Sequence, residues 1–242
     1  MFTIIVAENY EEVSHEASKL MRETLRSKEN PVLGLAAGST PLGLYEEMIT
    51  DYILGNTSYR KVRTWNLDEY LGVPENDPHS RRSFMNEHLF EKIDIFRENT
   101  HIPRGDTSDP EEECRRYEEE LQKTMIDLQI LGIGRDGHIG FNEPGTPFDA
   151  LTHVTTLTEE TRNDNARYFD GNPLLVPEKA ITMGPASIMR ARNIVIIATG
   201  ESKADAVYKM IKGPQKESCP ASILQDHSHV TVITDPAAAA RI

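Results

Sequence analysis

The sequence has only two cysteines, Cys114 and Cys219, a single tryptophan and no long apolar run. Two distant cysteines outside any CxxC pair indicate neither a disulfide framework nor a thiolate zinc site, and they suit a reducing cytoplasm. No apolar segment approaches the roughly 18 residues of a membrane-spanning helix. The N-terminal segment also lacks the basic stretch, apolar core and cleavage site of a signal peptide. These absences predict a soluble, cytoplasmic protein.

Basic residues are also in the minority: 26 Lys and Arg stand against 39 Asp and Glu, which gives a formal net charge of −13. Nucleic acids and anionic membranes are bound by clustered Lys and Arg, so we expect neither as a partner. An anionic small molecule must instead meet a local positive site. The length of 242 residues suits one large α/β domain, and we expect a single domain over residues 1–242.

Short β-branched apolar runs alternate with longer amphipathic stretches, which is the pattern of strands joined by crossover helices in an open, mostly parallel sheet. We expect a first helix capped by Asn9 and Glu12, and a charged surface helix over 111–125. The stretch 140–177 is poorly patterned and is either a mobile flap over a site or an ordinary connection. The expected strands are 2–6, 32–38, 62–68, 127–134, 193–200 and 229–234, with a weaker one at 180–184.

The first candidate binding feature is the end of the strand in LGLAAGSTPLG. Ligands of parallel sheets lie beyond the carboxyl ends of the strands. Here Gly38, Ser39 and Thr40 precede Pro41, which we expect at the first helical position. Free N–H groups of such a turn, with the two hydroxyls, can hold a phosphate at the positive end of the helix dipole. The turn lacks the Walker pattern, so it does not imply a nucleotide. The alternative is a Ser/Thr-capped helix without a ligand.

Two cations are candidates for the same phosphate. Lys203 follows Gly200 at another strand end, where a lysine at a helix N-terminus is unfavourable unless an anion offsets the dipole. Arg167 in TRNDNARYF can bind a phosphate through two N–H groups. Both side chains have an alternative role as solvated surface charges.

Candidate proton carriers lie in two places. Asp68 and Glu69 follow the strand that holds Trp65, and because side chains alternate along a strand, one of the two must face the site. A carboxylate near a bound sugar could take a proton from carbon. A helix cap or turn-forming Asp is the alternative.

The second place is LGIGRDGHIGFNEPG, where five glycines surround Asp136, His138 and Glu143. Glycines such as Gly137 let the backbone turn tightly and approach a ligand. Carboxylates near the imidazole would orient it and raise its proton affinity. A metal is the main competing interpretation, but the sequence has no HExxH pattern and we expect none. DHSH at 226–229 is expected to be a loop, and no GxSxG elbow indicates acyl transfer.

The motifs LGLAAGSTPLGLY, NLDEY, LGIGRDGHIGFNEPG, TRNDNARYF and GESKA occur in the order found in glucosamine-6-phosphate deaminases, and the sequence resembles that family from about residue 2 to 236. The resemblance implies a Rossmann-like α/β fold with helices on both faces. It also implies conversion of glucosamine 6-phosphate and water to fructose 6-phosphate and ammonia, without metal or organic cofactor.

The resemblance also implies roles for individual residues. Asp68 matches the base that moves a proton from C2 to C1, and His138 matches the ring-opening group, supported by Asp136 and Glu143. The substrate-binding positions that match are Gly38, Ser39, Thr40, Gly137, Arg167 and Lys203.

The sequence departs from the family in three respects. Allosterically activated members carry basic residues where His153 and Thr155 stand, and they continue further past the last strand. We therefore expect weak or absent activation by N-acetylglucosamine 6-phosphate, and a monomer or small homo-oligomer rather than a hexamer. Ala37 also stands where the family often has Thr, which removes one hydroxyl from the turn.

Two rival functions remain. A 6-phosphogluconolactonase shares the fold and a sugar-phosphate site but needs no carbon acid, so Asp68 discriminates between the two. A sugar-phosphate sensor would carry a DNA-binding helix-turn-helix segment, which we do not expect because the first strand is predicted at residue 2.

Overall fold

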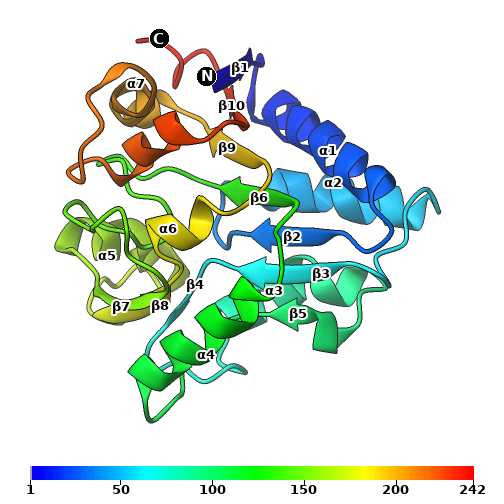
Figure 1. Ribbon diagram of the computed structural model, residues 1–242, viewed down its shortest axis with the longest axis horizontal. Helices are drawn as coiled ribbons and strands as arrows, with labels where there is room; N and C mark the ends of the chain where they lie inside the picture. The colour runs from blue at the N-terminus through cyan, green and yellow to red at the C-terminus, as the bar shows by residue number, and fades with distance from the viewer. Residues whose placement is uncertain (1) are drawn as a thin grey trace.

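The protein is described by a computed structural model that covers residues 2–242, and its main element is a parallel sheet (Figure 1). The strand order is β1-β10-β9-β6-β2-β3-β5, and every neighbouring pair is parallel. The predicted open, mostly parallel α/β sheet is thus confirmed. Its strands are β1 Phe2–Val6, β2 Val32–Leu35, β3 Arg63–Asn66, β5 Thr100–His101, β6 Leu128–Leu131, β9 Ile194–Ala198 and β10 Val230–Thr234.

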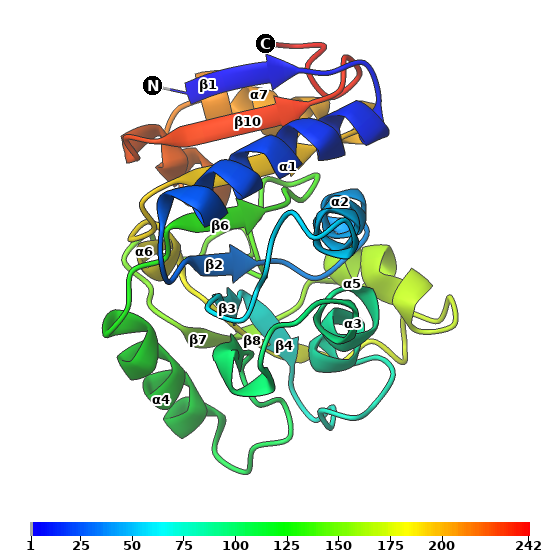
Figure 2. The same cartoon turned by 90° about the vertical axis from the view of Figure 1, so that its right-hand side faces the viewer.

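Helices cover both faces of this sheet, as Figures 1 and 2 show. Strand β9 explains why: Ile194 and Ile196 belong to one apolar core and Val195 and Ile197 to the other. A strand with apolar side chains on both faces needs a layer on each. Helices α1 (Tyr10–Ser27), α2 (Leu42–Ile53) and α3 (Arg81–His88) pack on one face, and α4 (Pro110–Gln122), α6 (Pro185–Ile188) and α7 (Ala204–Lys212) on the other. None of the helices within 2–242 has the length and apolarity to cross a bilayer.

A second, antiparallel sheet was not expected. It has the order β4-β8-β7, with β4 at Asp68–Tyr70, β7 at His153–Thr156 and β8 at Lys179–Thr182. The strand predicted over 62–68 is confirmed as β3 but ends earlier than expected, because the chain leaves the parallel sheet at Leu67. The Leu67 N–H donates to the Leu35 carbonyl, whereas its own carbonyl accepts from the Met183 N–H. The strand predicted near 180–184 exists, but in this small sheet.

Helix starts follow the sequence closely. The Asn9 side chain accepts a hydrogen bond from the Glu12 N–H, as predicted for the cap of α1. Pro41 is the residue before α2 rather than its first helical residue, so that prediction is wrong by one position. Helix α4 was expected to be a surface helix, but it buries Glu113 and Glu118 against neighbouring loops.

The poorly patterned stretch 140–177 contains regular structure. It holds β7, the helix α5 (Glu159–Asn165) and the 3₁₀ turn η3 (Ala166–Tyr168). Its residues Phe141, Phe169 and Val176 are buried in a small apolar cluster together with Tyr70 of β4. The remaining 3₁₀ turns are η1 Phe90–Lys92, η2 Arg97–Asn99, η4 Glu201–Lys203 and η5 Pro220–Asp226, and the loop expected at 226–229 begins where η5 ends.

Candidate active site

A cavity of about 130 Å³ lies where the carboxyl ends of β2, β3 and β6 meet. One water needs roughly 10–15 Å³, so the cavity has room for a small ligand. Its walls come from the turns after these strands, from the 3₁₀ turn that ends at Lys203 and from the α5–η3 segment. The sequence-predicted residues that line it are Gly38, Ser39, Thr40, Asp68, His138, Arg167 and Lys203.

The turn after β2 lines the cavity with Gly38, Ser39 and Thr40. Gly38 has a φ of +129°, which favours glycine, and this conformation turns the chain toward the start of α2. The Tyr10 hydroxyl holds the turn from behind, 3.0 Å from the Ser39 carbonyl oxygen. At the front, the Ser39 N–H donates to the Tyr168 hydroxyl at 2.6 Å. A donor of the predicted phosphate turn is therefore occupied by a side chain of the α5–η3 segment.

Two cations face this turn. Lys203 is half-buried, and its pKa is lowered by burial and by the nearby positive charges of Arg135 and Arg167, against the opposing effect of Asp164. Arg167 lies with its guanidinium carbon 4.9 Å from the centre of the Tyr168 ring. Burial and the repulsion from Arg167 make the charge of Lys203 costly without an anion, so the arrangement suits a phosphate.

Asp68 lies on the floor of the cavity as the first residue of β4. Its side chain is buried, and burial raises the pKa of the carboxyl above its ordinary value, against the lowering effects of Arg81 and His138. Glu69 points away, as the alternation along a strand requires. Its carboxylate accepts from the backbone N–H groups of Arg81 and Arg82 at the start of α3.

His138 has a carboxylate partner in the same loop. The Asp136 Oδ1 atom is 2.8 Å from His138 Nδ1 and also accepts from the His138 backbone N–H. Burial would raise the pKa of Asp136, but the contacts with His138 outweigh it and lower the pKa. Polar atoms of Asp136, His138 and Glu143 all lie within 4.8 Å of one another. Glu143, however, accepts from the N–H and hydroxyl of Thr158, the residue that caps α5.

Gly137 does not line the cavity. Its φ is +92°, and a Cβ added there would lie 2.5 Å from the Cys219 sulfur. A glycine is therefore needed at position 137 for two reasons: the backbone turn that precedes His138 and the close packing against Cys219.

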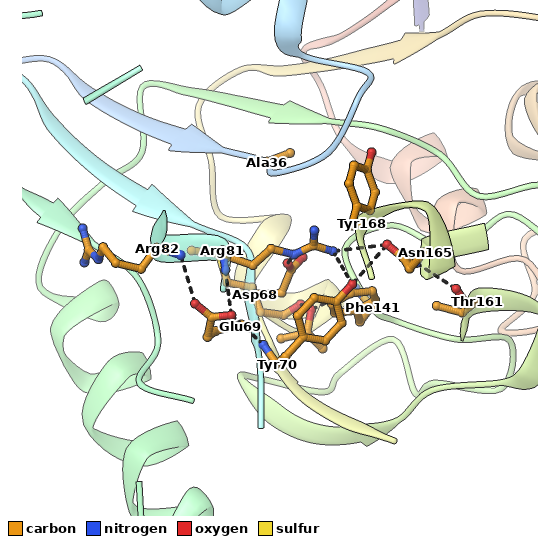
Figure 3. Close-up of polar contacts among 12 residues, drawn as sticks. Ala36, Asp68, Glu69, Tyr70, Arg81, Arg82, Phe141, Thr161, Asn165 and Tyr168 are labelled. Carbon is orange, nitrogen blue, oxygen red and sulfur yellow. Dashed lines mark hydrogen bonds and ion pairs between the residues drawn. The ribbon is translucent and has the colours of Figure 1, made fainter. Parts of the chain in front are cut away.

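The sequence interpretation did not include four further residues of the site. Arg81 lines the cavity beside Asp68, and Tyr70 and Asn165 hold its guanidinium group (Figure 3). The Tyr168 hydroxyl accepts a hydrogen bond from Ser39 N–H in the predicted phosphate turn. The pair Arg81-Arg82 after the capping Ser80 marks a helix start, but nothing in it indicates a contact with Asp68.

Known proteins share this arrangement of the chain. The family model of glucosamine-6-phosphate isomerases/6-phosphogluconolactonase matches residues 7–233. Glucosamine-6-phosphate deaminase 2 of Bacillus subtilis (strain 168) is 48% identical over 241 residues, which cover 99% of this chain and 97% of that protein. Glucosamine-6-phosphate deaminase of Geobacillus sp. (strain WCH70) is 50% identical over 234 residues, 96% of this chain and 92% of that protein.

Solved structures agree with the sequence relatives. A monomeric glucosamine-6-phosphate deaminase superposes with a TM-score of 0.97 at 44% identity, over 99% of this chain and 100% of that chain. The 6-phosphogluconolactonase of Trypanosoma brucei superposes with a TM-score of 0.83 over 100% of this chain and 99% of that chain, but at 21% identity it shows the fold alone. The chain therefore belongs to the glucosamine-6-phosphate isomerase/6-phosphogluconolactonase family, as its motifs predict.

Proposed function

We propose that this chain is a glucosamine-6-phosphate deaminase, which converts glucosamine 6-phosphate and water to fructose 6-phosphate and ammonia. The observation that carries the proposal is a buried carboxylate, Asp68, in the same cavity as a phosphate turn with its cations and an imidazole paired with an acid. Full-length relatives named as this deaminase at 48% identity support the substrate. A phosphate held at one end of the cavity would orient the sugar over Asp68 at the other.

The first step is opening of the sugar ring, because the closed form has no acidic C–H bond. The anomeric hydroxyl must lose a proton while the ring oxygen gains one. We assign both transfers to His138, since an imidazole exchanges protons near neutral pH. Asp136 fixes the orientation of the ring through Nδ1. Glu143 completes the group and links it to the start of α5 through Thr158.

The second step is proton transfer between carbons. Opening creates an aldehyde at C1, which makes the C2 proton acidic, and we assign its removal to Asp68. The aldehyde oxygen takes up a proton in the same step, and the product is an enolamine. Return of the proton to C1 gives an imine at C2, and water hydrolyses this imine to the ketone with loss of ammonia. Binding of the phosphate by the Gly38–Thr40 turn, Arg167 and Lys203 would supply orientation, which can be worth several kcal/mol of the barrier.

The group Asp136, His138 and Glu143 could also hold a metal, since its polar atoms lie within 4.8 Å of one another. We favour proton transfer because the carboxylate oxygens of this group already have contacts. Both Glu143 oxygens accept from Thr158, and Asp136 Oδ1 faces His138 Nδ1 and N–H. A cation would have to replace several of these contacts.

The rival function is hydrolysis of 6-phosphogluconolactone, which the same fold and phosphate site would accommodate. The test is to assay the wild-type protein with both substrates, following ammonia release from glucosamine 6-phosphate and acid release from the lactone. We expect ammonia release. Lactone hydrolysis without ammonia release would refute the proposed function.

We also propose that the enzyme responds weakly or not at all to N-acetylglucosamine 6-phosphate. His153 on β7 lines a groove shared with Glu111, Glu118 and Glu119, so a second phosphate would meet more negative than positive charge there. A monomer or small oligomer is our proposal for the assembly, supported by the monomeric relative. Both cysteines are free thiols, which supports a cytoplasmic location.

A further inference from the structure

Arg81 is a buried arginine in direct contact with the base of the proposed reaction. The residue is 5% exposed, and its Nε atom lies 3.3 Å from Asp68 Oδ1 (Figure 3). Within residues 2–242, this is the one ion pair that Asp68 makes. A fully buried arginine is rare unless it is paired, so the contact needs an explanation.

The far end of the Arg81 side chain is held on three sides. Its Nη2 atom donates to the Tyr70 hydroxyl at 3.1 Å and to Asn165 Oδ1 at 3.4 Å. The guanidinium carbon lies 4.6 Å from the centre of the Tyr70 ring and 5.2 Å from that of Phe141. These contacts fix the cation, because a planar guanidinium stacks and donates in defined directions.

The backbone of Arg81 is held as well. Its N–H donates at 2.9 Å to Glu69, the neighbour of Asp68 on β4. Strand β4 and Arg81 are therefore connected twice. The Arg81 backbone binds Glu69, and the Arg81 side chain forms the ion pair with Asp68. Helix α3 is thus positioned so that its first residue faces Asp68.

Asp68 needs such a partner to act as a base. A buried carboxyl tends to stay protonated, because burial disfavours the charged form, and a protonated acid cannot accept a proton from C2. We propose that Arg81 is a positioning residue that keeps Asp68 ionised and correctly oriented for this proton transfer. The inference rests on the proposed function for its catalytic consequence, but the ion pair itself does not.

Other charged and titratable groups near Asp68 do not replace Arg81. His138 faces it across the cavity from the glycine-rich loop, and its effect on the pKa of Asp68 is smaller than that of Arg81. Tyr45 of α2 and Tyr117 of α4 are buried phenols whose pKa values are raised, so they are neutral. Tyr70 is neutral for the same reason, and Glu69 is turned away on the strand.

The test compares Arg81→Gln with Arg82→Gln. Arg82 is the next residue of α3, but its guanidinium donates to Thr100, outside the cavity, so it is the matched control. The measurement is the pH dependence of kcat/KM for ammonia release from glucosamine 6-phosphate. An opposite charge at this distance lowers a carboxyl pKa by about 1–3 units, so we expect the acid limb of Arg81→Gln to move up by that amount. Activity should recover as the pH is raised, and Arg82→Gln should keep the wild-type limb.

A second readout does not depend on activity. The Asp68 carboxyl can be titrated by ¹³C NMR, with its signal assigned by its loss in Asp68→Asn. We expect it to titrate at a higher pH in Arg81→Gln than in the wild type. The inference would be overturned if Asp68 titrated at the same pH in Arg81→Gln and in the wild type. It would also be overturned if kcat/KM of Arg81→Gln were lower than that of the wild type by the same factor at every pH. If Arg81→Gln does not fold, Arg81→Lys takes its place, with a smaller shift expected and no shift refuting the inference.

The two readouts separate this inference from the proposed function. An inactive wild-type protein whose Asp68 titration still shifts in Arg81→Gln would refute the deaminase and keep the ion pair. A wild-type protein that releases ammonia, with no shift of the Asp68 titration in Arg81→Gln, would support the deaminase and refute the proposed role of Arg81.

Discussion

Replacement of Tyr168 by Phe should tighten substrate binding. The Tyr168 hydroxyl accepts a hydrogen bond from the Ser39 N–H at 2.6 Å, at a turn proposed to bind the substrate phosphate. A phosphate oxygen that uses this N–H must first displace the hydroxyl. A hydrogen bond of this kind contributes about 0.5–1.5 kcal/mol net, which corresponds to about a two- to tenfold change in an equilibrium constant. In Tyr168→Phe the ring and its contact with Arg167 remain, and only the competing hydroxyl is lost.

The assay is the KM for glucosamine 6-phosphate, together with the inhibition constant of inorganic phosphate. Both should fall by about two- to tenfold, with little change in kcat, because the hydroxyl competes for the phosphate site. Tyr208→Phe is the control, since Tyr208 stacks against Arg241 on the surface. An increase in both constants would show that the Tyr168 hydroxyl binds the phosphate, and would refute the reasoning.

Two further predictions concern Glu69 and His138. Burial raises the pKa of Glu69 from 4.5 to about 7. Between these two pH values Glu69 is ionised in the unfolded chain but still protonated in the folded protein, so a rising pH favours the unfolded chain. The free energy of unfolding of the wild type should therefore fall relative to Glu69→Gln between about pH 4.5 and 7, by about 3 kcal/mol. Urea unfolding of both proteins at the two ends of the window measures this, and a pH-independent difference would contradict it. For His138→Gln, ring opening is the step lost, so ammonia release should recover in part when substrate is supplied already open, and no recovery would contradict the assignment.

Six strands of the parallel sheet could be predicted from the sequence because they are local apolar runs, whereas β5 could not, because it is only the two residues Thr100–His101. The predicted strand ends placed Ser39, Asp68, His138 and Lys203 at one edge of the sheet. In the structure all four residues line one cavity. Parallel strands meet at their carboxyl ends whatever the details of the loops. That part of the site follows from topology.

The antiparallel sheet and Arg81 could not be predicted in this way. Strand β4 has three residues and pairs with β8 more than a hundred positions away, so the sequence predicts a strand near β8 but not its pairing with β4. Arg81 reaches Asp68 only because Glu69 accepts the first N–H groups of α3. Nor could the sequence predict the contact of Tyr168 with Ser39 in the proposed phosphate turn, because it joins residues 129 positions apart.

The most direct test of the account is proton transfer at carbon by Asp68. Wild-type protein and Asp68→Asn are incubated with glucosamine 6-phosphate in deuterated water, and ammonia and the deuterium on C1 of fructose 6-phosphate are both measured. We predict that the wild type labels C1 and that Asp68→Asn, while folded, loses both signals by at least about a hundredfold, the usual contribution of a general base. Ammonia release and C1 labelling by Asp68→Asn at the wild-type rate would contradict the account.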